Sequence, residues 1–293
     1  MALELIRNPS LSERTTLGLG GTAEVELVVR EKGDLDAVAQ FLSHENLRPF
    51  VIGRGSNLLV RDSHLDLALI RPDMPSGPTR VERNGDGLVV RCGAGQRLPG
   101  LLGWAQRAGF SGLENLTGIP GTVGGAVAMN AGSYGTSFGD LITRVRLWSP
   151  AQGLVWVDAD QCHFGYRHFS CPAHPGKSLV WEVELLLAET SADEVRNAMR
   201  SVYKKKQGTQ PVTAASAGCI FKNPEGESAG RLLDKAGFKG MRLGHMAFSD
   251  MHANFLINLG GGTSAQALDL MEAAKSAVSE KFGITLEPEV ILL

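Results

Sequence analysis

The hydrophobic pattern of the first sixty residues predicts a strand, a helix and two more strands. Residues 23–30 (AEVELVVR) are rich in β-branched side chains, which is typical of a strand. Residues 33–45 then place apolar side chains at helical spacing, at Leu35, Val38, Phe41 and Leu42. Residues 48–60 (RPFVIGRGSNLLV) indicate a strand, a tight turn and another strand. The chain therefore starts as a β-α-β unit with a glycine turn after its second strand.

The middle of the chain predicts one helix among several strands. Residues 88–95 (LVVRCGAG) indicate a strand, and residues 98–110 indicate a helix that Gly109 closes. Three apolar runs then predict successive antiparallel strands, at 144–150, 153–159 and 179–188.

The last third of the chain predicts two helices with capping boxes and a final strand. Ser191 and Glu194 mark the start of a helix from about residue 192, and Thr263 and Gln266 mark the start of another that stops near Gly283. The apolar stripe of the first of these helices lies at Val195, Met199 and Val202. The strand is expected over 284–293 (ITLEPEVILL).

Length and composition indicate a folded globular protein with more than one core. A chain of 293 residues, with 43% apolar and 20% charged residues, is longer than one hydrophobic core usually holds. We expect three segments, 1–62, 63–190 and 191–293, with the last strand (about 284–293) returning to the active site. The net charge of −2 gives no basic field that would favour nucleic acid.

The sequence predicts a cytoplasmic protein. No signal-peptide pattern is visible, and no apolar stretch approaches the ~18 residues of a membrane span. The four cysteines are widely spaced and form no C-x-x-C pair, which argues against a zinc site or a disulfide framework and for a reducing compartment.

Two glycine-rich runs are candidates for binding a ligand through the backbone. In the first, the turn Gly53-Arg54-Gly55-Ser56-Asn57 can form an anion-holding nest, although a plain hairpin turn explains it equally well. The second, residues 118–135, lies in a stretch without any charged residue from 115 to 139. Its many backbone donors and acceptors suit the pyrophosphate and ring edge of a large planar cofactor, and a buried structural loop is the alternative.

Five motifs in order resemble the UDP-N-acetylenolpyruvoylglucosamine reductase family over essentially the whole chain. They are G-R-G-S-N, G-I-P-G-T-V-G-G-A-x-x-M-N-A-G-x-Y-G, Y-R, S-A-G-C-x-F-K-N-P and L-E-P-E-V. The resemblance implies an α+β fold of the vanillyl-alcohol-oxidase (PCMH) type, in which two sub-domains hold FAD and a smaller α+β domain binds the substrate. The short third segment resembles the compact subtype that lacks a tyrosine loop insertion.

The resemblance implies an NADPH-dependent FAD enzyme of bacterial cell-wall (peptidoglycan) precursor synthesis. It would reduce the enolpyruvyl ether of UDP-N-acetylglucosamine enolpyruvate to UDP-N-acetylmuramate, with hydride passing from NADPH to FAD to substrate. Its partners would be this small UDP-sugar alone, without nucleic acid, membrane or metal, and a monomer is expected.

Three residues match the family's catalytic positions. Arg167 would stabilise a carboxylate that gains charge, since a guanidinium is permanently charged and planar, although a structural arginine is an open alternative. Glu289 matches the catalytic glutamate. Cys219 stands where serine is usual in the family, and a thiol with a pKa of ~8.5 is a better proton donor than a serine hydroxyl.

The resemblance also implies binding residues. The FAD-binding residues would be Gly53, Arg54, Gly55, Ser56, Asn57, Gly118, Pro120, Gly121, Thr122, Gly124, Gly125, Ala126, Asn130 and Gly132. The substrate-binding residues would be Tyr166, Lys222, Asn223 and Lys205, the last from a run (Lys204 to Lys206) that is otherwise a solvated helix end.

Two other functions stay open at the level of sequence. One is a related FAD-linked oxidase of alcohols or sugars, which the first two segments alone do not exclude. The other is a cysteine hydrolase that uses Cys219 with His245 or His252, although structural histidines are the simpler interpretation and such an enzyme leaves the uncharged glycine run unexplained.

Overall fold

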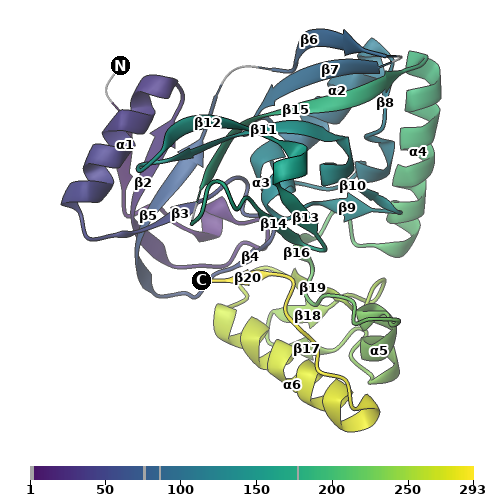
Figure 1. Ribbon diagram of the computed structural model, residues 1–293. Coiled ribbons are helices and arrows are strands. Elements are labelled where there is room, and N and C mark those ends of the chain that lie inside the picture. The colour runs from purple at the N-terminus through teal and green to yellow at the C-terminus, as the bar shows by residue number, and fades with distance from the viewer. Residues whose placement is uncertain (1–2, 75–76, 86, 177) are drawn as a thin grey trace. The chain divides into compact units, whose positions relative to one another are not determined.

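The computed structural model describes residues 3–74, 77–85, 87–176 and 178–293, and it contains two compact units (Figure 1). The first unit comprises residues up to 6, 25–53 and 67–204. The second comprises residues 7–24, 54–66 and 205–293, so that two short N-terminal segments fold together with the C-terminal part of the chain. The three-segment division, with FAD bound by 1–62 and 63–190 and substrate by 191–293, stays a prediction.

A four-stranded sheet with one helix forms the first part of the fold. The order of its strands is β1-β2-β5-β3, and β3 and β5 run parallel. The elements are β1 Glu4–Arg7, β2 Thr22–Val29, α1 Lys32–His44, β3 Arg48–Val51 and β5 His64–Pro72. The predicted β-α-β start is therefore confirmed, with helix α1 one residue earlier than its apolar spacing indicated.

A larger antiparallel sheet forms the main body of the first unit. Its strand order is β12-β11-β15-β7-β6, with β8 paired to the end of β15. The strands are β6 Thr79–Asn84, β7 Gly87–Gly93, β8 Phe110–Ser111, β11 Ile142–Ser149, β12 Gly153–Asp158 and β15 Leu179–Glu189. The three successive antiparallel strands expected from 144 to 188 are confirmed as β11, β12 and β15.

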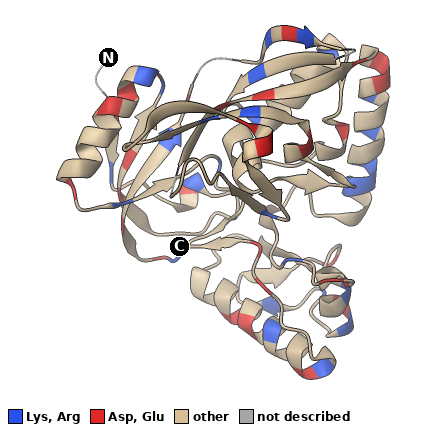
Figure 2. Ribbon diagram, in the orientation of Figure 1, with Lys and Arg blue, Asp and Glu red and all other residues tan. Residues whose placement is uncertain are grey.

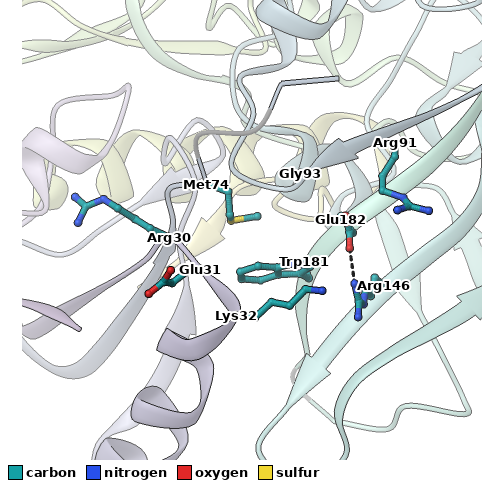
Figure 3. A pocket seen from close by; sticks show the side chains of 9 residues that line it. All are labelled: Arg30, Glu31, Lys32, Met74, Arg91, Gly93, Arg146, Trp181 and Glu182. Atoms are coloured by element: carbon teal, nitrogen blue, oxygen red, sulfur yellow. Dashed lines mark hydrogen bonds and ion pairs between the residues drawn. The ribbon is translucent and has the colours of Figure 1, made fainter. Parts of the chain in front are cut away.

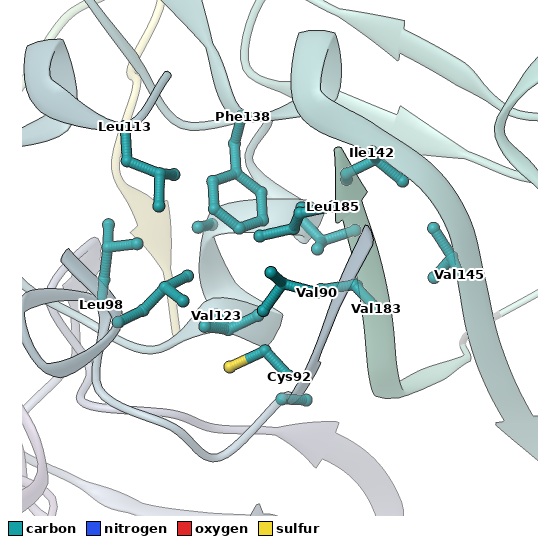
Figure 4. Packing of buried hydrophobic residues seen from close by; sticks show 14 of the residues in the cluster. Val90, Cys92, Leu98, Leu113, Val123, Phe138, Ile142, Val145, Val183 and Leu185 are labelled. Atoms are coloured by element: carbon teal, nitrogen blue, oxygen red, sulfur yellow. The ribbon is translucent and has the colours of Figure 1, made fainter. Parts of the chain in front are cut away.

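Helices α2 (Leu98–Ala108) and α3 (Val123–Ala128) contribute to the core on one face of this sheet. Side chains alternate along the strands, so Val90, Cys92 and Val183 enter this core (Figure 4). Arg91 and Glu182 lie on the other face. Gly109, with φ of 73°, closes α2 as predicted. The same unit carries two small hairpins, β9 Gly132–Ser133 with β10 Thr136–Ser137, and β13 His163–Gly165 with β14 His168–Ser170.

Helix α4 (Ala192–Thr209) starts at the predicted capping box. The Glu194 N–H donates to Ser191 Oγ (3.1 Å), and the Ser191 N–H donates to Glu194 Oε2 (3.1 Å). Acidic residues lie at its N-terminal end and basic residues further along, as Figure 2 shows, which complements the helix dipole.

The second unit contains a four-stranded sheet of order β16-β19-β18-β17 and two helices. Its elements are β4 Leu58–Leu59, β16 Ala215–Cys219, α5 Ala229–Lys235, β17 Arg242–Leu243, β18 Met246–Phe248, β19 Phe255–Asn258, α6 Ser264–Phe282 and β20 Ile291–Leu292. Helix α6 has the predicted capping box of Thr263 and Gln266, and it ends at Gly283 with φ of 67°. Leu17, Leu19 and Leu59 enter the same core as α5 and α6.

The prediction of a continuous strand over 284–293 is wrong in extent. Only β20 is regular, and it pairs parallel to β4. Before it, Pro288 makes an isolated antiparallel bridge to Phe221. Proline lacks a backbone N–H and cannot donate to a ladder, so Pro288 interrupts the run.

Candidate active site

The first glycine turn requires glycine on steric grounds. Gly55 has φ of 58°, and a Cβ at this position would lie 2.1 Å from the Arg14 carbonyl oxygen. A Cβ at Gly53 would lie 2.5 Å from Thr122 Oγ1. Since Thr122 belongs to the second run, the two glycine-rich runs meet at this contact. Arg54 is exposed, and Ser56 and Asn57 are half-buried.

The second glycine-rich run contains a helix that the sequence did not predict. Thr122 caps α3, since its Oγ1 accepts the Gly125 N–H at 3.3 Å. The ideal Cβ of Gly124 would lie 2.9 Å from Ala94 Cβ, so glycine is needed for α3 to lie close to the chain after β7. Gly118 and Gly121 have φ of 84° and 116°, so the backbone before the helix takes conformations that favour glycine. Pro120 lies between them, and Ala126 is buried.

Asn130 links this run to the hairpin of β13 and β14. It is buried, its Oδ1 accepts the Gly139 N–H (2.9 Å), and its Nδ2 donates to the Gly165 carbonyl (3.0 Å). We expected Asn130 to bind a cofactor, and in the structure its amide holds backbone groups of its own unit. The hairpin turn that follows Gly165 is thereby fixed relative to the glycine-rich run.

Tyr166 and Arg167 form the turn of that hairpin. Gly165 pairs with His168 across the turn, and Arg167 has φ of 55°, in the left-handed region. Such a conformation costs of order 1–3 kcal/mol in a residue other than glycine, and strain of this kind clusters at functional sites. The guanidinium lies over the Tyr166 ring (5.0 Å from its centroid), and Nη2 is 3.5 Å from the Gly132 carbonyl oxygen. Arg167, Tyr166 and Gly132, all predicted site residues, therefore lie together in the first unit.

Cys219 ends strand β16 directly after a bulge. Ser216 pairs with Ile257 and Cys219 with Phe255, so one residue more on β16 than on β19 lies between the two pairs. Gly218 in this bulge has φ of 79°. Bulges of this kind often lie beside active sites, because they redirect a side chain. Cys219 is half-buried, unlike the other three cysteines.

Glu289 lies on the chain that runs beside Cys219. Its N–H donates to the carbonyl oxygen of Ile220 (2.7 Å), the residue after the cysteine. Its carbonyl oxygen accepts from Asn57 Nδ2 (3.1 Å), and the Ile291 N–H donates to the Asn57 carbonyl (2.9 Å). Asn57 was expected to contact a cofactor. The structure shows that it also joins the first glycine turn to the backbone of Glu289.

Two predicted substrate residues, Lys222 and Asn223, follow Cys219. Lys222 Nζ lies 3.3 Å from Glu287 Oε2, and the Lys222 N–H donates to the Glu287 carbonyl (2.9 Å). Asn223 Oδ1 accepts the Ala229 N–H (3.0 Å) at the start of α5. Both residues are thus fixed by structural contacts in the second unit.

The lysine run at the end of α4 contains one buried side chain. Lys204 and Lys205 are exposed, but Lys206 is 3% exposed, and burial lowers its pKa to about 8. The sequence already indicates this burial, because position 206 lies four residues after Val202 and so falls on the apolar stripe of the helix. Lys205, the predicted substrate residue, is exposed, whereas its neighbour Lys206 is buried.

Cys92, Cys162 and Cys171 are buried. Burial raises the pKa of the Cys92 and Cys162 thiols to about 12. Cys162 and Cys171 flank the hairpin that carries Arg167, and the neighbouring Cys171 adds to the raised pKa of Cys162, a proximity that their spacing does not suggest. Buried structural cysteines are unreactive, and Cys219 is the one cysteine that is not buried, so it is the cysteine suited to chemistry.

Two cavities in the first unit are lined by other residues than the predicted site residues. One, of about 390 Å³, lies against the sheet face opposite α3 and is lined by Lys32, Met74, Trp181 and charged neighbours (Figure 3). Arg146 in it is paired with Glu182 at 2.7 Å. The other, of about 320 Å³, adjoins Cys171 and His174. Within the described residues, no group of three or more His, Cys, Asp and Glu could hold a metal ion, and no helix has the length and apolar character to cross a membrane.

Comparisons with known proteins give a consistent result. The FAD binding domain family matches residues 23–158, and the C-terminal domain family of UDP-N-acetylenolpyruvoylglucosamine reductase matches residues 210–293. The reductase of Nitratidesulfovibrio vulgaris is 45% identical over 99% of both chains, and that of Oleidesulfovibrio alaskensis is 48% identical over 98% of this chain and 97% of its own. The crystal structure of the reductase from Thermus caldophilus has a TM-score of 0.82 at 36% identity, covering 100% of this chain and 99% of that one.

Proposed function

This chain belongs to the UDP-N-acetylenolpyruvoylglucosamine reductase family, and we propose that it reduces the enolpyruvyl ether of UDP-N-acetylglucosamine enolpyruvate to UDP-N-acetylmuramate. The fold expected from the sequence, an α+β FAD-binding fold with a smaller α+β substrate domain, is confirmed. The enzyme is an NADPH-dependent flavoprotein oxidoreductase of peptidoglycan precursor synthesis. The oxidase alternative has less support, because the family match extends over the C-terminal domain.

The residues of the first unit suit FAD. Gly53 and Gly124 allow the backbone around α3 to pack closely, and the run around α3 offers backbone groups without a charged side chain. We assign the glycine turn and residues 118–132 to binding of this group. When bound, FAD supplies the acceptor for hydride from NADPH and the donor of hydride to the substrate.

The side chains of this chain would handle charge and proton during reduction of the substrate. Hydride adds to the terminal carbon of the C=C bond, and negative charge develops at the neighbouring carbon and in its carboxylate. Arg167 would bind that carboxylate and stabilise the charge as it forms. The Cys219 thiol would transfer its proton to the neighbouring carbon, which completes the reduction and leaves a thiolate that regains a proton from solvent.

The hydrogen bond from the Glu289 N–H to the Ile220 carbonyl carries the catalytic assignment. It places a carboxylate-bearing residue beside the segment that presents Cys219. We propose that Glu289 acts on the same carbon or on the protonation state of the thiol. Tyr166, Lys222, Asn223 and Lys205 would contact the UDP-sugar. We further propose a cytoplasmic monomer, which light scattering of the purified protein would test.

Spectra of the purified protein before and after two successive additions, NADPH and then the sugar, test the function. The purified protein should absorb near ~450 nm, as flavins do, NADPH should bleach this band without the sugar, and the enolpyruvyl sugar should restore it under anaerobic conditions. A protein that takes up no FAD, or one whose reduced band recovers with oxygen but not with the sugar, would overturn the proposal.

Variants of Cys219 test the proton donor. Cys219→Ala should keep bleaching by NADPH and lose most reoxidation by the sugar, while Cys219→Ser should keep measurable turnover. Normal reoxidation in the alanine variant would remove Cys219 from the mechanism without affecting the flavin assignment.

A further inference from the structure

Asn254 contacts the backbone of the two residues that follow Cys219. Its Oδ1 accepts the Phe221 N–H (3.0 Å), its Nδ2 donates to the Phe221 carbonyl (2.8 Å), and its own carbonyl accepts the Ile220 N–H (2.8 Å). The side chain is 2% exposed, so these bonds form away from water. One residue therefore satisfies three backbone groups immediately after the cysteine.

The same short segment is held on its other side by the chain that carries Glu289. The Ile220 carbonyl accepts the Glu289 N–H (2.7 Å), and the Lys222 N–H donates to the Glu287 carbonyl (2.9 Å). Ile220 thus bonds to Asn254 through its N–H and to Glu289 through its carbonyl. The position of Cys219 relative to Glu289 depends on both sets of bonds.

We propose that Asn254 is a positioning residue for the reduction of the substrate, which sets Cys219 and the backbone of Glu289 in register with each other. The inference rests on the proposed role of Cys219 as proton donor. The bulge before Cys219 removes regular ladder pairing between Ser216 and Cys219, so the strand alone does not determine where the thiol lies. The three bonds from Asn254 supply the missing restraint directly after it.

An asparagine side chain is chemically suited to this role. A carboxamide has both a donor and an acceptor, which one N–H and one C=O of the same residue require together. An ionised aspartate would accept the N–H but could not donate to the Phe221 carbonyl. A protonated aspartic acid could do both, and it has nearly the same shape.

Asn258, at the end of strand β19 and four residues after Asn254, provides a matched control. Its Nδ2 donates to the Leu17 carbonyl (3.0 Å), and its Oδ1 accepts the N–H groups of Gly260 and Gly262 (3.0 Å each). Its side chain therefore makes three bonds to backbone, against two made by the Asn254 side chain, and none of the three goes to residues 220 and 221.

The experiment measures the two half-reactions of the FAD-loaded enzyme separately by stopped flow. We expect Asn254→Ala to slow reoxidation of the reduced enzyme by the enolpyruvyl sugar by about 100-fold, since misplacement of about 1 Å costs this much. Bleaching by NADPH should stay within about 2-fold, and KM for the sugar should change less than kcat. Asn258→Ala should lose comparable thermal stability without this selective effect on reoxidation.

Asn254→Asp gives a second, pH-dependent measurement. The buried carboxyl should have a raised pKa, so its protonated form should become populated as the pH falls from 8 towards about 5.5. The reoxidation rate of this variant, divided by that of the wild type, should rise over the same range. His252, whose Nδ1 accepts the Asn254 N–H at 3.2 Å, and Lys239 near it are present in both proteins, so the ratio removes their contribution.

Four results would decide against the inference or its premise. Equal slowing of both half-reactions in Asn254→Ala, or a ratio for Asn254→Asp that does not change with pH, would show a structural role only. Normal reoxidation in Asn254→Ala together with slow reoxidation in Cys219→Ala would overturn this inference alone. Normal reoxidation in Cys219→Ala would instead overturn the role of Cys219 on which it rests.

Discussion

The contact between the two glycine-rich runs predicts the effect of a single methyl group. In Gly53→Ala, the new Cβ would lie 2.5 Å from Thr122 Oγ1 and 3.3 Å from Thr122 Cγ2. Close C···O contacts start at about 3.3 Å, so the threonine has to move away by most of an ångström. Thr122 is β-branched and therefore stiff about χ1, and its Oγ1 is the cap of α3. The substitution should displace the cap.

The size of the effect follows from the loss of the cap. Loss of a threonine N-cap costs about 0.5–2 kcal/mol, typically ~1. If this cost falls on the FAD-bound state, affinity for FAD should fall by roughly 2- to 30-fold, since ~1.4 kcal/mol is tenfold in a dissociation constant. Titration of the apoprotein with FAD, followed by flavin fluorescence, measures it.

A control and a rescue make the test specific. Gly33→Ala adds the same methyl group in α1, where nothing lies within 4 Å, and should leave FAD affinity unchanged while raising stability by up to about 1 kcal/mol. Adding Thr122→Ser to Gly53→Ala should recover part of the affinity, because serine lacks the Cγ2 methyl group and its side chain can shift away from the new Cβ with less strain while it still caps α3. Wild-type FAD affinity in Gly53→Ala would refute the reasoning.

Three further predictions concern other parts of the chain. Lys206→Met should raise the free energy of unfolding at pH 7, where the buried ammonium is costly. This gain should shrink as the pH rises from 8 to 10.5, because the unfolded wild-type chain then binds more protons than the folded one, and denaturant titrations at pH 7 and 9.5 measure it. Lys205→Gln should instead mainly raise KM for the UDP-sugar. Burial lowers the pKa of His174, which is 2% exposed and hydrogen-bonded to Ser178. The free energy of unfolding should therefore fall as the pH drops below about 6.5. In thermal melts between pH 7 and 5, His174→Gln should make this fall shallower. Arg167→Lys and Glu289→Gln should spare bleaching by NADPH and slow reoxidation by the sugar, and a stalled first half-reaction would contradict their assignment.

Local patterns predicted the regular elements because the determinants of those elements are local. The capping box of Thr263 and Gln266, the glycine at 109 and the apolar stripe of α4 all lie within a few residues of the feature that they specify. Helix α3 was missed because Gly124 and Gly125 have low helix propensity, and its stability comes from the Thr122 cap and from packing beside Ala94.

The site was predictable as a set of residues but not as an arrangement. Motif resemblance pointed to Cys219, Arg167 and Glu289. The structure adds the contacts between distant positions, such as Asn57 with Glu289 and Asn254 with Phe221. A hydrogen bond that joins residues 232 positions apart leaves no periodic trace in the sequence. The left-handed conformation of Arg167 was equally invisible, because arginine has no preference for it.

The interleaving of the two units has a consequence for how the protein is made. Residues 7–24 and 54–66 leave the ribosome early, yet they belong with residues 205–293, and Leu17, Leu19 and Leu59 need α5 and α6 to cover them. At a synthesis rate of about 5–20 residues per second, these apolar side chains stay uncovered for roughly ten seconds or more before α5 and α6 are made. Nascent chains should therefore be recognised by chaperones during this interval, and a fragment of residues 205–293 alone should fail to fold.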